Sequence, residues 1–322
     1  MLEKLIKLAK FIGNTPLINL EGKKVNLYAK LEYNNFSGSS KDRAAYSILR
    51  DAILTGKIDK RTTIVASSSG NFAISIASIC CLLKIKFIPV VDPNINSDYE
   101  ALLSLLSYKM IKVSVRDETG GFLLTRINTV QQVCYQIKNS FFADQYSDPN
   151  NCRGYYDLGN EILSALDIVD FIFIAVSSGG AITGISTLVK KRNHRVKIIA
   201  VDVKGSVIFG HAPEKRFISG IGSSQASPIM KDAIIDEVIH VSQCDIVVGC
   251  YELLREQVIF GGASSGAVYF AAKRYFQKFE TEKRPVAVLI FPDKGSAYLD
   301  TIYNKDWEKG LIEKLKQPIH QE

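Results

Sequence analysis

The chain has 322 residues, of which 47% are hydrophobic and 23% charged, and its formal net charge is +7. This composition excludes a disordered chain, a collagen-like chain and a disulfide-rich miniprotein. The length favours about two domains, and we expect no segment with the roughly 18 apolar residues that a membrane span needs.

Apolar runs of strand length alternate with helix-like segments along the chain. In the first half, strands are predicted at 64–67, 86–92 and 110–115, and helices at 72–83, 97–107 and 121–138. In the second half, strands are predicted at 170–176, 196–202, 238–241 and 286–291, and a helix at 181–191. Continuous apolar strands that alternate with helices indicate parallel sheets covered on both faces.

This order predicts an α/β protein with two doubly wound open parallel-sheet domains that face a shared cleft. A turn at 148–151 marks the boundary. We therefore assign residues 1–145 to an N-terminal domain and 146–322 to a C-terminal domain, with early strands free to cross between them. The short amphipathic N-terminus lacks the continuous apolar core of a signal peptide, so we expect a cytoplasmic protein.

Cysteine, histidine and basic residues are too scattered to indicate a metal site or a nucleic-acid surface. The six cysteines show no C-x-x-C spacing, and the four histidines show no H-E-x-x-H pattern, so we expect no metal. The one dense basic run, 190–195, is typical of a solvated helix end. We accordingly expect neither a nucleic acid nor a membrane as a partner, and a small anionic substrate becomes a use for the positive charge.

Loops rich in glycine and serine follow several predicted strands, where open α/β sheets bind ligands. Residues 66–71 and 177–181 both lead into helices, and the second loop suits a phosphate group. It lacks the lysine of a nucleotide P-loop, and no G-x-G-x-x-G motif occurs, so a phosphate monoester is favoured over a nucleotide. The loop at 219–224 either closes over a ligand or serves as a plain connector.

Residues 262–266 match the motif G-x-S-x-G between a strand-like run at 258–260 and a helix. That context is typical of a hydrolase nucleophile elbow. Asp293 and Asp300 follow as candidate acids, but the one later histidine is His320 in the polar tail. A serine hydrolase that uses Ser264 is therefore a rival hypothesis.

Lys41 stands in the segment G-S-S-K-D-R at the start of a predicted helix. The N-terminus of a helix repels cations, which lowers the pKa of a lysine placed there. A neutral amine is the form that a Schiff base requires. Taken alone, the motif favours an ordinary surface lysine.

Taken together, the motifs resemble fold-type II pyridoxal-phosphate enzymes of the cysteine synthase and cystathionine β-synthase family. They are G-N-T-P-L (13–17), A-K-L-E-Y-N (29–34), G-S-S-K-D-R (38–43), S-S-G-N (68–71), the glycine loop and G-A-S-S-G (262–266). The resemblance covers nearly the whole chain and implies pyridoxal 5'-phosphate as cofactor, with Lys41 as the Schiff-base lysine. Asn71 would bond the phenolic oxygen and Ser264 the pyridine nitrogen. The phosphate would be held by Ser177, Ser178, Gly179, Gly180 and Ala181.

Two stretches, 120–126 and 202–210, resemble a narrower group, the N-(2-amino-2-carboxyethyl)-L-glutamate synthases of staphyloferrin B and diaminopropionate biosynthesis. This resemblance implies a homodimer that joins O-phospho-L-serine to L-glutamate and releases phosphate. Ala181 and the pair at 296–297 depart from the pattern of cysteine synthases. A cysteine synthase that uses sulfide remains an alternative, and so does a non-catalytic relative, against which the presence of Lys41 argues.

The same resemblance implies a set of substrate residues. They are Ser68, Ser69, Gly70, Gln145, Tyr146 and Gly220. We add Arg126, because its planar fork suits a phosphate or a carboxylate and two glycines precede its helix. The alternative for Arg126 is an exposed position on the predicted helix.

Overall fold

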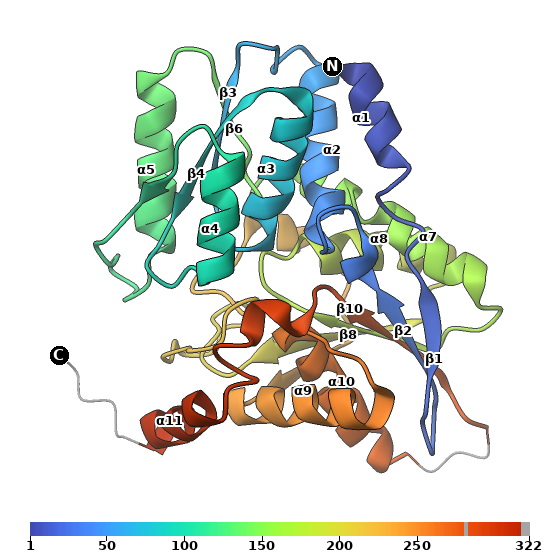
Figure 1. The fold of residues 1–322 in the computed structure, drawn as a ribbon. Coiled ribbons are helices and arrows are strands. Elements are labelled where there is room, and N and C mark those ends of the chain that lie inside the picture. The colour runs from blue at the N-terminus through green and yellow to red at the C-terminus, as the bar shows by residue number, and fades with distance from the viewer. Residues whose placement is uncertain (280–282, 317–322) are drawn as a thin grey trace.

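A computed structural model describes residues 1–279 and 283–316, and its larger sheet has six strands (Figure 1). Their order is β1 (Leu17–Leu20), β2 (Asn26–Leu31), β10 (Val286–Phe291), β7 (Phe171–Ala175), β8 (Lys197–Val203) and β9 (Glu237–Val241). Strand β1 pairs antiparallel with β2, and the other neighbours are parallel. The last strand of the chain therefore lies inside the sheet, between β2 and β7.

The smaller sheet has four parallel strands, in the order β5 (Ile111–Lys112), β4 (Lys86–Val91), β3 (Thr63–Ser67) and β6 (Ser140–Phe142). Pro89 lies inside β4, although proline disfavours central strands. Strand β5 is only two residues long and pairs with Val90 and Val91. Pro89 therefore stands where β4 is the edge of the sheet, a position that tolerates proline.

Helices cover both faces of the smaller sheet because its side chains alternate. Ile64 and Ala66 of β3 contact α2 (Lys41–Leu54) and α3 (Asn71–Leu83), whereas Val65 points to α5 (Leu123–Gln136). This two-residue period is that of a strand. Helix α4 (Ser97–Leu106) packs on α3, and α1 (Leu2–Ala9) packs on both α2 and α3.

The larger sheet is covered in the same way. Ile172 and Ile174 of β7 face α7 (Tyr156–Ala165) and α8 (Gly180–Arg192), and Phe171 and Phe173 face α9 (Gln243–Gln257) and α10 (Ala263–Gln277). Short helices α6 (Pro149–Arg153), η1 (Glu32–Asn34), η2 (Pro228–Asp232) and η3 (Gly295–Tyr298) connect these elements, and α11 (Lys305–Lys316) follows.

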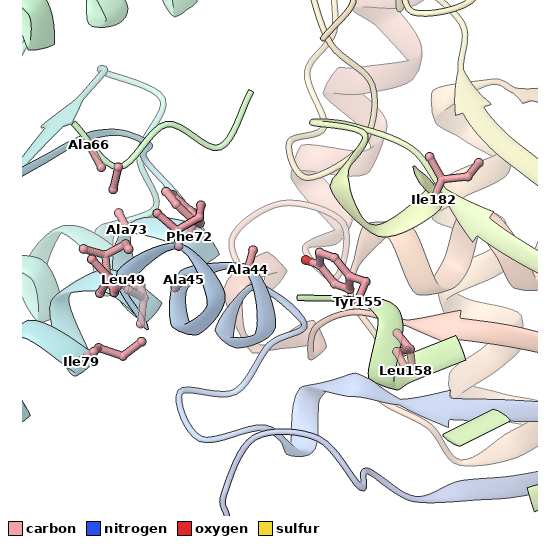
Figure 2. Close-up of a cluster of buried hydrophobic side chains, with 14 of the residues drawn as sticks. Ala44, Ala45, Leu49, Ala66, Phe72, Ala73, Ile79, Tyr155, Leu158 and Ile182 are labelled. Carbon is pink, nitrogen blue, oxygen red and sulfur yellow. The ribbon is translucent and has the colours of Figure 1, made fainter. Parts of the chain in front are cut away.

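One hydrophobic core joins the two sheets. Figure 2 shows it running from Phe72 on α3 past Ala44 on α2 to Tyr155 and Ile182 beside the larger sheet. The architecture confirms the predicted α/β class with parallel sheets. The larger sheet takes β1 and β2 from the start of the chain, and the division into residues 1–145 and 146–322 stays a prediction. Within the described ranges, every helix is too short or too polar to cross a membrane.

The strand predicted at 258–260 is wrong. Helix α9 continues to Gln257, and Val258 then adopts a left-handed conformation with φ of 57°, which ends the helix. Ile259 fills the core from an irregular segment. The apolar run therefore reflects burial after a helix end and not a strand.

Candidate active site

Loops from both sheets meet at the carboxyl ends of the parallel strands. Lys41 Nζ lies 3.5 Å from Ser178 Oγ, in the loop after β7. Asn71, four residues after β3 ends, donates through Nδ2 to Asp293 Oδ2 over 2.8 Å. Asp293 itself follows β10 by two residues. These contacts bring together segments that are more than 200 residues apart in the chain, at the position where open α/β sheets bind ligands.

Lys41 is held at the first turn of α2 by the chain after β10. Ser40 N donates to Pro292 O over 2.9 Å, and Ser39 forms a bridge with Asp293. Burial lowers the pKa of the Lys41 amine from its ordinary value, and the charge of Asp293 partly opposes this shift. The direction agrees with the expectation from the sequence, but burial is the main cause, and a neutral amine is favoured.

The loop 177–181 packs closely on the residues beneath it. Gly179 has a φ of +85°, which favours glycine, and it precedes the first residue of α8. A Cβ atom on Gly179 would lie 2.1 Å from Met230, and one on Gly180 would lie 2.0 Å from Asn151. The first N–H groups of α8 have no carbonyl partner within the helix. Small side chains and free N–H groups at a helix start are what a phosphate monoester requires.

Two side chains fix the orientation of the Asn71 amide. Tyr99 on α4 donates its hydroxyl to Asn71 Oδ1 over 2.5 Å, while Asn71 Nδ2 faces Asp293. Tyr298 also donates to Asp293 Oδ2, over 3.0 Å. The second N–H of Asn71 thus stays available to a ligand, because only one is used by Asp293.

Asp293 is a site residue that the sequence analysis noticed only as a hydrolase acid. Its side chain is 2% exposed, and its Oδ1 atom is buried without a hydrogen-bond partner in the described part of the chain. Burial raises the pKa of Asp293, against the hydrogen bonds from Asn71 and Tyr298 and the charge of Lys41. Its position directly after a buried strand was the signal that could have identified it.

The predicted substrate loop is already partly engaged by the protein. Ser68 Oγ accepts hydrogen bonds from Gly70 N and Ala73 N, both 3.3 Å, at the start of α3. Gln145 Nε2 donates to Ser67 O over 3.2 Å, which places Gln145 beside this loop. Ser69, in contrast, contacts two charged side chains, Asp92 and Arg126.

Arg126 lies at the substrate loop and not on the exposed face of α5. Its Nη1 atom is 3.0 Å from both Asp92 Oδ2 and Ser69 Oγ. Ser69 also donates to Asp92 over 2.9 Å. Burial raises the pKa of the Tyr146 phenol. The positive charge of Arg126 opposes this rise, and the charge of Arg216 opposes it more weakly. Asp92 and Arg216 were not among the predicted site residues, although Asp92, like Asp293, follows a buried strand.

Ser264 lies at the start of α10 and is 4% exposed. Its hydroxyl donates to Gly220 O over 3.3 Å, and Gly220 has a φ of +87° that favours glycine. The hydrolase hypothesis requires a preceding strand and a histidine partner. The strand is absent from 258–260, and none of the described histidines hydrogen-bonds to Ser264. His320 lies outside the described residues.

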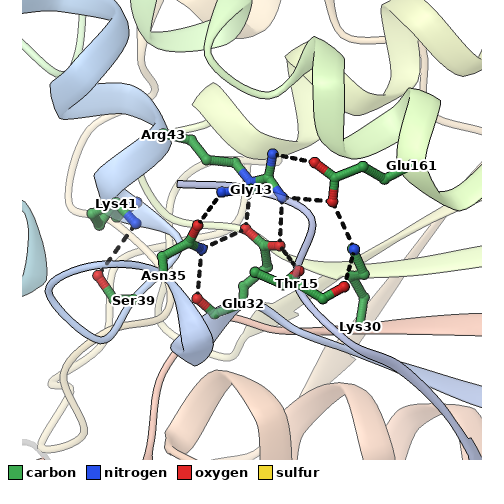
Figure 3. A network of polar contacts seen from close by, with 9 residues as sticks. All are labelled: Gly13, Thr15, Lys30, Glu32, Asn35, Ser39, Lys41, Arg43 and Glu161. Atoms are coloured by element: carbon green, nitrogen blue, oxygen red, sulfur yellow. Dashed lines mark hydrogen bonds and ion pairs between the residues drawn. The ribbon is translucent and has the colours of Figure 1, made fainter. Parts of the chain in front are cut away.

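A buried ion network begins two residues after Lys41 (Figure 3). Arg43 Nε lies 2.6 Å from Glu32, and Arg43 Nη1 lies 2.8 Å from Glu161. Lys30 Nζ approaches the other oxygen of Glu161 to 2.6 Å. Glu32 and Arg43 are 0% and 3% exposed. The network ties α2, which begins with Lys41, to the end of β2 and to α7.

The chain is similar in sequence and in fold to known proteins. Residues 8–293 match the family model described as "Pyridoxal-phosphate dependent enzyme". A protein of Ralstonia nicotianae named N-(2-amino-2-carboxyethyl)-L-glutamate synthase is 37% identical over 302 residues, which are 92% of this chain and 89% of that protein. A protein of the same name from Cupriavidus metallidurans is 36% identical over 303 residues, with the same coverage. The crystal structure of O-acetylserine dependent cystathionine beta-synthase from Helicobacter pylori, 27% identical, superposes with a TM-score of 0.83 over 92% of this chain and 98% of that one.

Proposed function

Because the chain belongs to the family of pyridoxal-phosphate dependent enzymes, we propose that it joins O-phospho-L-serine to L-glutamate. The products would be N-(2-amino-2-carboxyethyl)-L-glutamate and phosphate, formed by replacement of the phosphate at the β-carbon of the serine. The observation that carries this proposal is the 37% identity to a synthase of that name over 92% of the chain. The site adds an arginine, Arg126, beside the substrate loop.

The residues at the site fit pyridoxal 5'-phosphate. Lys41 would hold it covalently, and the loop of Ser177, Ser178, Gly179, Gly180 and Ala181 would receive its phosphate. Asn71 keeps one N–H free for the phenolic oxygen, and the Ser264 hydroxyl would face the ring nitrogen. The bound cofactor supplies an electron sink for the negative charge that develops at the substrate α-carbon.

Lys41 carries the proton transfers in this proposal. Its neutral Nζ takes the proton from the α-carbon of the serine substrate and returns it after the amine has added to the β-carbon. Ser69 and the N–H groups at the start of α3 bind the substrate carboxylate. The loop that contains Gly220 excludes water, which would otherwise compete with the amine for the β-carbon.

An absorbance spectrum followed by substrate addition tests the function. The purified protein should be yellow, and O-phosphoserine with glutamate should release phosphate and form the joined amino acid. Strong preference for O-acetylserine with sulfide would contradict the proposal and favour a cysteine synthase. A colourless protein whose Ser264 reacts with a fluorophosphonate would instead favour a hydrolase.

A cytoplasmic location and a homodimer belong to the same proposal.

Ser264→Ala should leave the cofactor bound, shift its absorbance spectrum and slow the release of phosphate. The spectral shift and the slower release are expected because the variant has no hydroxyl to bond the ring nitrogen. Ser264→Asp should favour a protonated ring and divert substrate into side reactions, measured as pyruvate formation. Cofactor content of each variant is the control. An unchanged spectrum in both variants would contradict the assignment of Ser264.

Arg126→Ala should lower kcat/KM for O-phosphoserine about 10- to 100-fold, because one charge-assisted contact is lost. The spectrum of the unliganded enzyme should stay unchanged, since Arg126 contacts Asp92 and Ser69 and not Lys41. Steady-state kinetics at saturating glutamate make the measurement. Full activity in this variant would remove Arg126 from the substrate site.

A further inference from the structure

A second arginine, Arg216, lies beside Gly222, which is hydrogen-bonded to Ser177 in the loop 177–181. It belongs to the segment after β8, which two hydrogen bonds attach to residues 176 and 177, where β7 leads into the loop 177–181. Gly222 N donates to Val176 O over 2.8 Å, and Ser177 Oγ donates to Gly222 O over 3.1 Å. Arg216 is therefore held at the carboxyl ends of the larger sheet, whereas Arg126 is held beside the smaller one.

The fold makes room for this guanidinium and holds it in place. A Cβ atom on Gly222 would lie 2.6 Å from Arg216 Nη1, so a side chain at that position would displace the arginine. Arg216 Nη2 donates to Ser224 Oγ over 2.9 Å. Burial lowers the pKa of Arg216, while the charge of Asp202 opposes this shift. The guanidinium still remains charged near neutral pH, because the ordinary pKa of arginine is far above 7.

The two arginines differ in how their charge is balanced. Arg126 forms an ion pair with Asp92 at 3.0 Å. Arg216 hydrogen-bonds to a neutral hydroxyl, and although the charge of Asp202 acts on it, no carboxylate in residues 1–279 or 283–316 lies within ion-pair distance of it. A half-buried guanidinium with unused donors attracts an anionic group more strongly than one that is already paired.

We propose that Arg216 binds the side-chain carboxylate of the incoming amino-acid amine and so selects glutamate as the second substrate. The inference rests on the proposed function. Arg126, which is hydrogen-bonded to Ser69, would bind the O-phosphoserine substrate. Arg216 lies in the segment that follows β8 of the larger sheet. The two anionic groups would thus be bound by two different arginines, one bonded to Ser69 and one beside Gly222.

Comparison of glutamate with glutamine as the amine substrate tests the proposal. Glutamine has nearly the same shape but a neutral side chain, so the wild type should favour glutamate about 10- to 100-fold in kcat/KM. In Arg216→Met the ratio should approach one, through loss of activity with glutamate. Single-turnover release of phosphate from O-phosphoserine alone should stay within about threefold of wild type.

The matched control is Lys215→Met, which removes a positive charge from the exposed neighbouring residue and should keep the preference for glutamate. Retained preference in Arg216→Met would overturn the inference, and so would a variant that is impaired in the O-phosphoserine step instead. Cofactor absorbance and circular dichroism verify that the variant is folded and loaded. A wild type that ignores glutamate and uses sulfide would overturn the proposed function itself, which is a distinguishable result.

Discussion

Lys41→Ala should lose the visible absorbance of the bound cofactor and at least about 100- to 10,000-fold of its turnover, because the variant has no amine to move the α-proton. The fold should survive, since the Lys41 side chain makes one long contact, 3.5 Å to Ser178 Oγ. Absorbance spectra and phosphate release from O-phosphoserine make the measurement.

Lys41→Arg is the matched control for charge. It keeps a cation at the site but provides no amine that can form a Schiff base. Both variants should therefore lose the cofactor absorbance and the turnover, while their circular dichroism spectra stay like that of the wild type. Wild-type turnover in Lys41→Ala would remove Lys41 from the chemistry.

Arg43→Met should lower the free energy of unfolding by about 3–5 kcal/mol, because it leaves the buried carboxylate of Glu32 without a positive charge and with only the neutral donors Thr15 and Asn35. Glu32 is 0% exposed, so water cannot replace the lost contact. Urea denaturation followed by circular dichroism measures the change. The double variant with Glu32→Gln should recover part of the loss, since the uncompensated charge is then removed.

The control is Lys112→Met, which breaks an ion pair of similar length at the surface. Lys112 Nζ lies 2.8 Å from Glu100, but its side chain is 42% exposed. Such pairs contribute about 0–1 kcal/mol. Equal effects of the Arg43 and Lys112 substitutions would show that burial does not govern the strength of the network.

Local patterns predicted the strands that are buried on both faces. The run 286–291 coincides with β10, and the predicted strands at 64–67 and 170–176 agree with β3 and β7 within one residue at each end. Strand β2 was missed because charged Lys30 interrupts its apolar pattern, and this lysine is paired with Glu161. The prediction at 258–260 failed because burial after a helix end produces the same apolar run as a strand.

The motifs led to Lys41, Asn71 and Ser264, whose positions in loops and at helix starts were readable from the sequence. The positions of two acids after buried strands were readable from the sequence, but the residues that they pair with were not. Asp92 and Asp293 matter through contacts with Arg126 and Asn71, which lie 34 and 222 positions away. Pairings of this kind depend on how the sheets bring distant loops together, and one sequence does not contain that geometry.

The central place of β10 has a consequence for how the protein is synthesised. Strands β1 and β2 leave the ribosome first, yet β2 finds its parallel partner only when residues 286–291 emerge. Until then the two strands form an isolated hairpin, which is marginal in water. Such non-local pairing slows folding and leaves an open edge exposed on the nascent chain. Asp293, which contacts Asn71, follows β10, so this contact of the candidate site can form only after residues 286–293 have been synthesised.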